Sequence, residues 1–184
     1  MLKFEKPEYK VKEYVRDNFY GKFEIEPLER GFGTTLGNAL RRVMLSSLPG
    51  DAITSVHIDG VLHEFQTLEG IVEDVTTIVL NLKNVVVKNN TEEDQILKLY
   101  CDKEGVVTAG DIETSGEVEI VNKDQEIATI AKGGKLDMEL IVANGRGYVP
   151  SNENKKYIEN QKIGFIPIDA LYSPIERVSY FVDQ

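Results

Sequence analysis

The sequence has no long apolar run and only one cysteine, Cys101. A membrane-spanning helix needs about 18 or more consecutive apolar residues, and no stretch of this chain approaches that length. The N-terminus also has too few apolar residues for a signal peptide. A lone cysteine can neither close an internal disulfide nor hold a structural zinc ion by itself. We therefore expect a cytoplasmic protein with no membrane segment, in which Cys101 is a small buried hydrophobic side chain.

Basic residues are also in short supply, with 21 lysines and arginines against 31 acidic residues, which gives a net charge of -10. Proteins that hold nucleic acid by its phosphates usually carry the opposite sign, because lysine and arginine displace counterions. We therefore expect no direct DNA binding by this segment. The hydrophobic fraction of 41% is that of an ordinary soluble protein, so the chain can bury a core in one domain or two small lobes.

Alternation of apolar and polar residues is the most frequent pattern in the sequence. Residues 9–15 and 19–28 predict two strands joined by a short polar turn at residues 16–18. Further strands are predicted at residues 53–58, 61–65, 85–88, 96–100, 117–121, 127–130, 136–142, 163–168 and 178–182.

Only two segments have the spacing of helices. Residues 35–48 follow Thr34, a suitable N-cap, and precede Pro49, which stops a helix. Residues 71–82 repeat apolar side chains at helical spacing and place acidic residues near the N-terminal end, where the helix dipole favours them. Two helices among many strands predict an α+β fold.

The first predicted helix has two distinct sides on a helical wheel. Leu36, Ala39, Leu40, Val43 and Met44 form an apolar stripe suited to a core. On the opposite side Leu45 lies between Arg41 and Arg42, a combination suited to a protein interface. A solvated polar face is the ordinary alternative. Gly37 costs up to about 1 kcal/mol relative to alanine inside a helix, which favours a position where another helix or backbone approaches closely.

Three arrangements of residues invite a chemical interpretation. The glycine-rich turn at residues 31–35 precedes a helix and could attract an anion, but it lacks the ending of a Walker motif, so a tight strand-to-helix turn is preferred. His63 and Glu64 lack the second histidine of a zinc-protease motif. The serines are in no nucleophile elbow. We therefore expect no catalytic residue, no metal and no cofactor. A small-molecule-binding or hydrolytic α+β domain that uses the turn or the His57/His63 pair stays open as the alternative.

Six short segments of the chain are more distinctive. They are LERGFGTTLGNALRRVMLSSLPG at 28–50, VHIDGVLHEF at 56–65, EDV at 73–75 with LNLK at 80–83, GRGYVP at 145–150 and YSPIERV at 172–178. Together, and in this order, they closely resemble the bacterial RNA polymerase alpha-subunit family. The resemblance spans nearly the whole chain and is weakest over residues 89–135.

The resemblance implies a two-lobed α+β fold. Residues 1–50 and 175–184 would form a dimerisation lobe, and residues 51–174 an inserted, mostly β lobe. The family's role is a non-catalytic scaffold of DNA-directed RNA polymerase, which forms a homodimer and gathers the beta and beta-prime subunits. The dimerisation helix would present Leu36, Gly37, Leu40, Val43 and Met44. Arg42 and Leu45 match the family's beta-subunit contact, and Lys83 and Ile168 match positions associated with large-subunit docking.

The resemblance also implies two departures. Family chains continue past Gln184 with more of the dimerisation lobe, so we expect a homodimer weakened by truncation. They also carry a small C-terminal domain that contacts DNA and activators, and this sequence does not contain it.

Overall fold

The computed structural model describes residues 6–158 and 164–183. The chain divides into two compact units. The terminal unit comprises Met1–Val43 and Arg177–Gln184, and the central unit comprises Met44–Glu176. In the described residues, no helix is long and apolar enough to cross a membrane.

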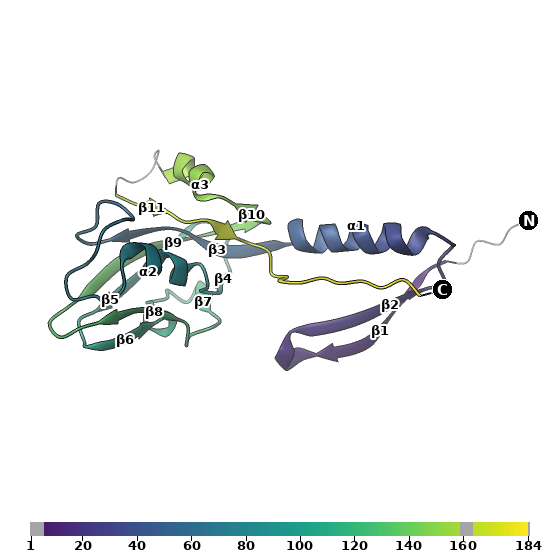
Figure 1. The fold of residues 1–184 in the computed structure, drawn as a ribbon, viewed down its shortest axis with the longest axis horizontal. Helices are drawn as coiled ribbons and strands as arrows, with labels where there is room; N and C mark the ends of the chain where they lie inside the picture. Colours follow the sequence, from purple (N-terminus) through teal and green to yellow (C-terminus); the bar gives the residue numbers. More distant parts are fainter. Residues whose placement is uncertain (1–5, 159–163, 184) are drawn as a thin grey trace, which may run out of the picture. The chain divides into compact units, whose positions relative to one another are not determined.

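The terminal unit begins with an antiparallel hairpin of β1 (Glu8–Val15) and β2 (Tyr20–Glu26). A 3-10 turn, η1 (Arg16–Asn18), joins the two strands, and the hairpin stands out in purple in Figure 1. The predicted strand pair and its polar turn are therefore confirmed.

A β-bulge at Lys12 gives this hairpin one apolar face. The register shifts between Val11 and Glu13, so the extra residue brings Tyr14 to the same side as Tyr9 and Val11. Their cross-strand partners are Gly21, Phe23 and Ile25. The other face carries the ion pairs Lys10–Glu26 and Lys12–Glu24. The hairpin therefore needs a partner for its apolar face, because two strands alone are marginally stable in water.

Helix α1 (Phe32–Ser46) begins three residues earlier and ends two residues earlier than predicted. It starts directly after Gly31, whose φ of 90° suits a tight turn, and the N–H of Phe32 donates to the carbonyl of Glu29. The helix ends before Leu48 because the residue preceding a proline is sterically driven out of the helical region.

The C-terminal residues 178–182 were predicted as a strand, and this prediction is wrong. They form no ladder and lie instead along α1 (Figure 1). Arg41 Nε donates to the carbonyl oxygen of Val178 at 3.3 Å. Farther along, the Tyr180 ring lies against Gly37 and the Val182 side chain against Gly33. Residues four positions apart on α1 thus contact residues two positions apart in the C-terminal segment. The contacts pair later helix residues with earlier C-terminal residues, so the two segments run antiparallel. A close approach at Gly37 therefore exists, but the ring of Tyr180 makes it and not the helix or backbone that was expected.

A four-stranded antiparallel sheet organises the central unit, in the order β11-β3-β9-β5. Its strands are β3 (Pro49–Ile58), β5 (Gln95–Cys101), β9 (Leu136–Arg146) and β11 (Ile166–Pro167). Three two-stranded ladders accompany it. These pair β4 (Val87–Asn89) with β7 (Val118–Ile120), β6 (Gly105–Thr108) with β8 (Glu126–Ile130), and β10 (Tyr148–Val149) with β12 (Ala170–Leu171).

Helix α2 (Val75–Leu82) is four residues shorter than predicted. Asp74 is its N-cap, with Oδ1 accepting the backbone N–H of Thr77 at 2.7 Å, which satisfies a helix donor and ends the helix there. Ile71 pairs instead with Ile130 in a β-bridge. The helix buries Val75, Ile78 and Leu82.

Other local predictions were wrong. Residues 61–65 form no strand, and helix α3 (Ser151–Ile158) was not predicted. Its sequence is mostly polar and buries only Asn154 among the side chains described, so it has no apolar periodicity to detect.

The strands β6, β10 and β12 and the 3-10 helix η2 (Ala109–Asp111) were also missed. The start of the predicted strand 163–168 lies outside the described residues. The mixture of helices and sheets confirms the α+β class.

The core lies in the central unit, where side chains of the main sheet, α2 and the smaller ladders pack together. Its largest fully buried members include Ile58, Ile78, Leu82, Leu97, Leu99, Ile127, Ile130, Leu136, Met138, Leu140 and Ile168. Cys101, predicted to be buried, is only partly so and packs against this core. A smaller cluster, Ala52, Ala170 and Tyr172, packs beside β3.

Candidate protein-interaction surfaces

The terminal unit has no core of its own. None of its described residues is buried, although many of its side chains are large and apolar. The exposed ones include Tyr9, Val11, Tyr14, Phe19, Phe23, Phe32, Leu40, Val43, Phe181 and Val182. Exposed apolar surface of this extent is characteristic of an interaction site.

Helix α1 has no buried residue on either side. The stripe predicted as core is open: Leu40 is 39% exposed and Val43 is 51% exposed, while Leu36, Gly37 and Met44 are partly buried. The stripe therefore lies at the surface of the single chain.

The side of α1 opposite the apolar stripe is about as exposed to solvent as the stripe itself. Arg42 is exposed, and Leu45 is partly buried, like Met44. Arg41 is exposed as well, and its Nε donates to the carbonyl oxygen of Val178.

An apolar loop at residues 60–72 is a surface that the sequence prediction missed. Leu62 is 90% exposed and Phe65 is 80% exposed. Gln66 holds the turn, since its Nε2 donates to the Gly60 carbonyl and its Oε1 accepts the Leu62 N–H. Farther along, the Glu73 carboxylate accepts the N–H of Thr129 at 2.6 Å. Residues 61–65 had been attributed to a strand, but Val61 is buried while Leu62 and Phe65 are exposed.

Lys83 and Asp169 form an ion pair that joins separate elements of the central unit. Lys83, at the C-terminal cap of α2, places Nζ 2.5 Å from Asp169 Oδ2. The other carboxylate oxygen accepts the backbone N–H of Ser151, the first residue of α3, at 2.7 Å. The hydrogen bond from Lys83, followed by that from Ser151, lowers the pKa of Asp169 from 3.8 to about 2.

This depressed pKa predicts a pH-dependent contribution to stability. Ionised Asp169 stabilises the fold fully above pH 3.8, and the contribution is lost as the pH falls through about 2. We expect Asp169→Asn to lower the free energy of unfolding at pH 7 by about 1 kcal/mol, because solvent partly screens the ion pair. Urea unfolding of both proteins at several pH values measures this difference. A difference that persists undiminished at pH 2 would contradict the assignment, and Lys83→Met should show the same trend more weakly.

Ile168, predicted as a possible docking residue, is 0% exposed. Its side chain belongs to the core of the central unit, so it is not available to contact a partner. Its backbone is equally fixed: its N–H donates to Thr54, and its carbonyl accepts from Asn154. Of the two residues predicted for docking, Lys83 is the one with a partly exposed side chain, at 30%.

The histidines considered for metal binding have different surroundings. His57 Nδ1 lies 2.9 Å from the carbonyl oxygen of Gly164, and its ring packs against Phe165. His63 is exposed on the apolar loop. Across the described residues, no group of three or more histidine, cysteine or acidic side chains could hold a metal ion.

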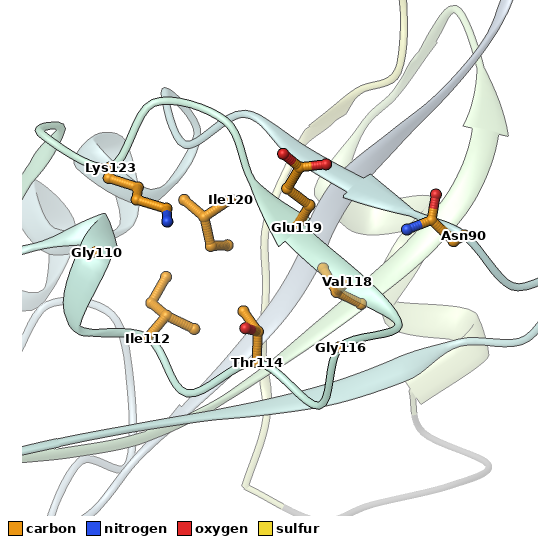
Figure 2. Close-up of a pocket in the computed structure, with 9 residues that line it drawn as sticks. All are labelled: Asn90, Gly110, Ile112, Thr114, Gly116, Val118, Glu119, Ile120 and Lys123. Carbon is orange, nitrogen blue, oxygen red and sulfur yellow. The ribbon is translucent and has the colours of Figure 1, made fainter.

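A pocket of about 340 Å³ lies beside β7 and η2 (Figure 2). Ile112, Val118 and Ile120 supply apolar walls, and Glu119 and Lys123 supply the charged groups. Thr114 provides the hydroxyl among its lining side chains. This lining contains no histidine or cysteine and no paired carboxylates, so it offers none of the usual arrangements for acid–base or nucleophilic catalysis.

The sequence matches known proteins throughout its length. Residues 56–173 match the family model described as RNA polymerase Rpb3/RpoA insert domain. Curated relatives named DNA-directed RNA polymerase subunit alpha match all 184 residues, with 55% identity in Symbiobacterium thermophilum, 55% in Moorella thermoacetica and 54% in Desulfitobacterium hafniense. The chain spans 58% of the length of each of these relatives. With a matched insert domain and this identity across every residue, the chain belongs to the bacterial RNA polymerase alpha-subunit family.

Proposed function

We propose that this chain is an assembly scaffold of DNA-directed RNA polymerase, which dimerises and gathers the beta and beta-prime subunits in the cytoplasm. The observation that carries the proposal is the terminal unit, whose described residues include many large apolar side chains and none that is buried. Such a unit gains its missing burial by association, because each buried large apolar side chain contributes about 1.5–3 kcal/mol.

Dimerisation is proposed for the apolar stripe of α1. Leu36, Gly37, Leu40, Val43 and Met44 all lie on this helix, and Leu40 and Val43 are exposed in the single chain. An apolar helical stripe that can pack against its copy suits a two-fold interface, which buries the same patch on both subunits. Residues 1–50 with 175–184 remain the proposed dimerisation lobe, and residues 51–174 the proposed insert.

Docking of the large subunits is proposed at three places. Arg42 and Leu45 on α1 would contact the beta subunit. Lys83 and the apolar loop at residues 60–72 would supply further contacts from the central unit. The turn that carries Leu62 is closed by hydrogen bonds of Gln66, so less backbone freedom is lost there when a partner covers the exposed leucine.

We propose that catalysis lies outside this chain. Template-directed nucleotide transfer would be carried out by the large subunits, and this subunit would contribute by holding them together. A small-molecule or hydrolytic function at the His57/His63 pair is not favoured, because the His57 ring is already engaged by Gly164 and Phe165.

The beta-subunit contact is tested by Arg42→Ala and Leu45→Ala in a chain extended to the length of its relatives. Each substitution should weaken beta-subunit capture about tenfold, or 1–2 kcal/mol, while the melting temperature barely changes. Arg42→Lys should recover only part of the loss, because lysine lacks the planar array of donors.

Arg41→Ala is the matched control, since this neighbouring arginine bonds to Val178 within the chain. It should leave capture unchanged. Normal capture by Arg42→Ala and Leu45→Ala would remove this side of α1 from the interface. A large loss of thermal stability in Leu45→Ala would instead show that Leu45 supports the fold.

A further inference from the structure

Asp169 lies where three elements of the central unit meet. One oxygen of its carboxylate faces the ammonium of Lys83 at the end of α2, and the other accepts the first N–H of α3. Asp169 itself lies between β11 and β12. Lys83 and Asp169 are 86 positions apart in sequence, so the fold alone brings them together.

The backbone around Asp169 leaves its carboxylate little freedom. The neighbours on both sides, Ile168 and Ala170, are each 0% exposed. Hydrogen bonds to Thr54 and from Asn154 fix the peptide groups of Ile168. The buried side chains thus anchor the segment from inside while the intervening carboxylate reaches Lys83.

This ion pair differs from the exposed pairs of the same unit. The Lys83 and Asp169 side chains are 30% and 27% exposed at a separation of 2.5 Å. For Lys98 and Glu139 the corresponding values are 66%, 31% and 3.5 Å. A free lysine side chain samples many rotamers, and fixing it costs conformational entropy. The Lys83 ammonium is therefore restrained more strongly than that of an ordinary surface lysine.

We propose that Asp169 is a positioning residue for partner docking, which holds the Lys83 ammonium in place for an oxygen acceptor on a large polymerase subunit. This inference rests on the docking role proposed for Lys83. An ammonium has three N–H donors, and the ion pair with Asp169 needs only one of them. Asp169 thus orients Lys83 before the partner arrives, so that less freedom is lost on binding. It also gives Ile168 an indirect role, as the buried anchor of the residue beside it.

A double-mutant cycle tests the proposal in a chain of the relatives' length, assembled with the large subunits. The variants are Lys83→Ala, Asp169→Asn and both together, each measured for large-subunit capture and thermal melting. Asparagine is chosen because its amide oxygen can still accept the N–H of Ser151 while the charge facing Lys83 is removed. We expect about a tenfold loss of capture for Lys83→Ala and a three- to tenfold loss for Asp169→Asn. The double variant should bind no more weakly than Lys83→Ala.

Two control measurements separate positioning from general stability. Lys98→Ala and Glu139→Gln remove the more exposed ion pair and should leave capture unchanged. Asn154→Ala removes the tie between α3 and Ile168 and should lower the melting temperature without producing a loss of capture that depends on Lys83.

Each remaining outcome has a distinct meaning. If Lys83→Ala weakens capture and Asp169→Asn does not, the positioning role is wrong and the docking role of Lys83 stands. An equal loss from Asp169→Asn in the Lys83→Ala background would show that Asp169 acts independently of Lys83, which also overturns the inference. If Lys83→Ala has no effect, the proposed docking role of Lys83 itself fails.

Discussion

Gly50→Ala is expected to lower the free energy of unfolding of the central unit by about 3 kcal/mol or more. Gly50 on β3 lies directly opposite Gly145 on β9, and together they leave a notch that Tyr172 occupies. A Cβ added at Gly50 would overlap the backbone carbonyl oxygen of Tyr172. That carbonyl cannot move easily, because the N–H of Tyr172 donates to Gly147 at 2.8 Å and its side chain is buried.

Gly37→Ala is the informative comparison for this substitution. Its added Cβ would meet the ring of Tyr180, a side chain that is partly exposed and can rotate away. Alanine also favours a helix over glycine by up to about 1 kcal/mol, so the net change should be small. Urea denaturation of both variants measures the contrast. An unchanged unfolding midpoint for Gly50→Ala would show that the notch is not tightly packed.

The second large effect is expected at the proposed dimer interface. Leu40→Asp combined with Val43→Asp should weaken the homodimer of a chain of the relatives' length by at least about a hundredfold, or roughly 3 kcal/mol. Both side chains are exposed in the single chain, so the carboxylates remain hydrated in the monomer and lose their water only on association. Sedimentation across a range of concentrations measures the dissociation constant.

Asn38→Asp is the matched control, because it adds a carboxylate to an exposed position on the same helix. It should leave the dimer intact, and all variants should retain their thermal stability as monomers. A dimer that survives the double substitution would mean that another surface holds the two copies together.

Sequence patterns predicted the elements whose stability is local. Alternating residues located the β1–β2 hairpin and most strands of the main sheet, because each of these strands has one apolar side. The prediction began α2 too early, at residue 71, and placed Asp74 inside the helix, because Ile71 also contacts the core. Regularly spaced apolar residues indicate which side chains contact the core. They do not show whether such a residue belongs to a helix or, like Ile71, to a β-bridge.

Tertiary contacts explain what the sequence did not reveal. Helix α3 is held by Asn154 and by Asp169, which lie outside any apolar pattern. Residues 178–182 alternate like a strand, but their alternate side chains contact a helix. The ion pair of Lys83 with Asp169 joins residues 86 positions apart, and no local pattern encodes such a pair.

The packing of the C-terminal segment on α1 has a consequence for synthesis on the ribosome. The hydrogen bond between Arg41 and Val178 cannot form until Val178 has been synthesised, and Val178 is 137 positions later in the chain. At translation rates of about 5–20 residues per second, that delay is roughly 7 to 27 seconds. During this interval the central unit can emerge and fold while the helix still lacks its covering segment. The nascent chain therefore passes through a stage in which Gly33, Gly37 and Arg41 lack their contacts with the C-terminal segment.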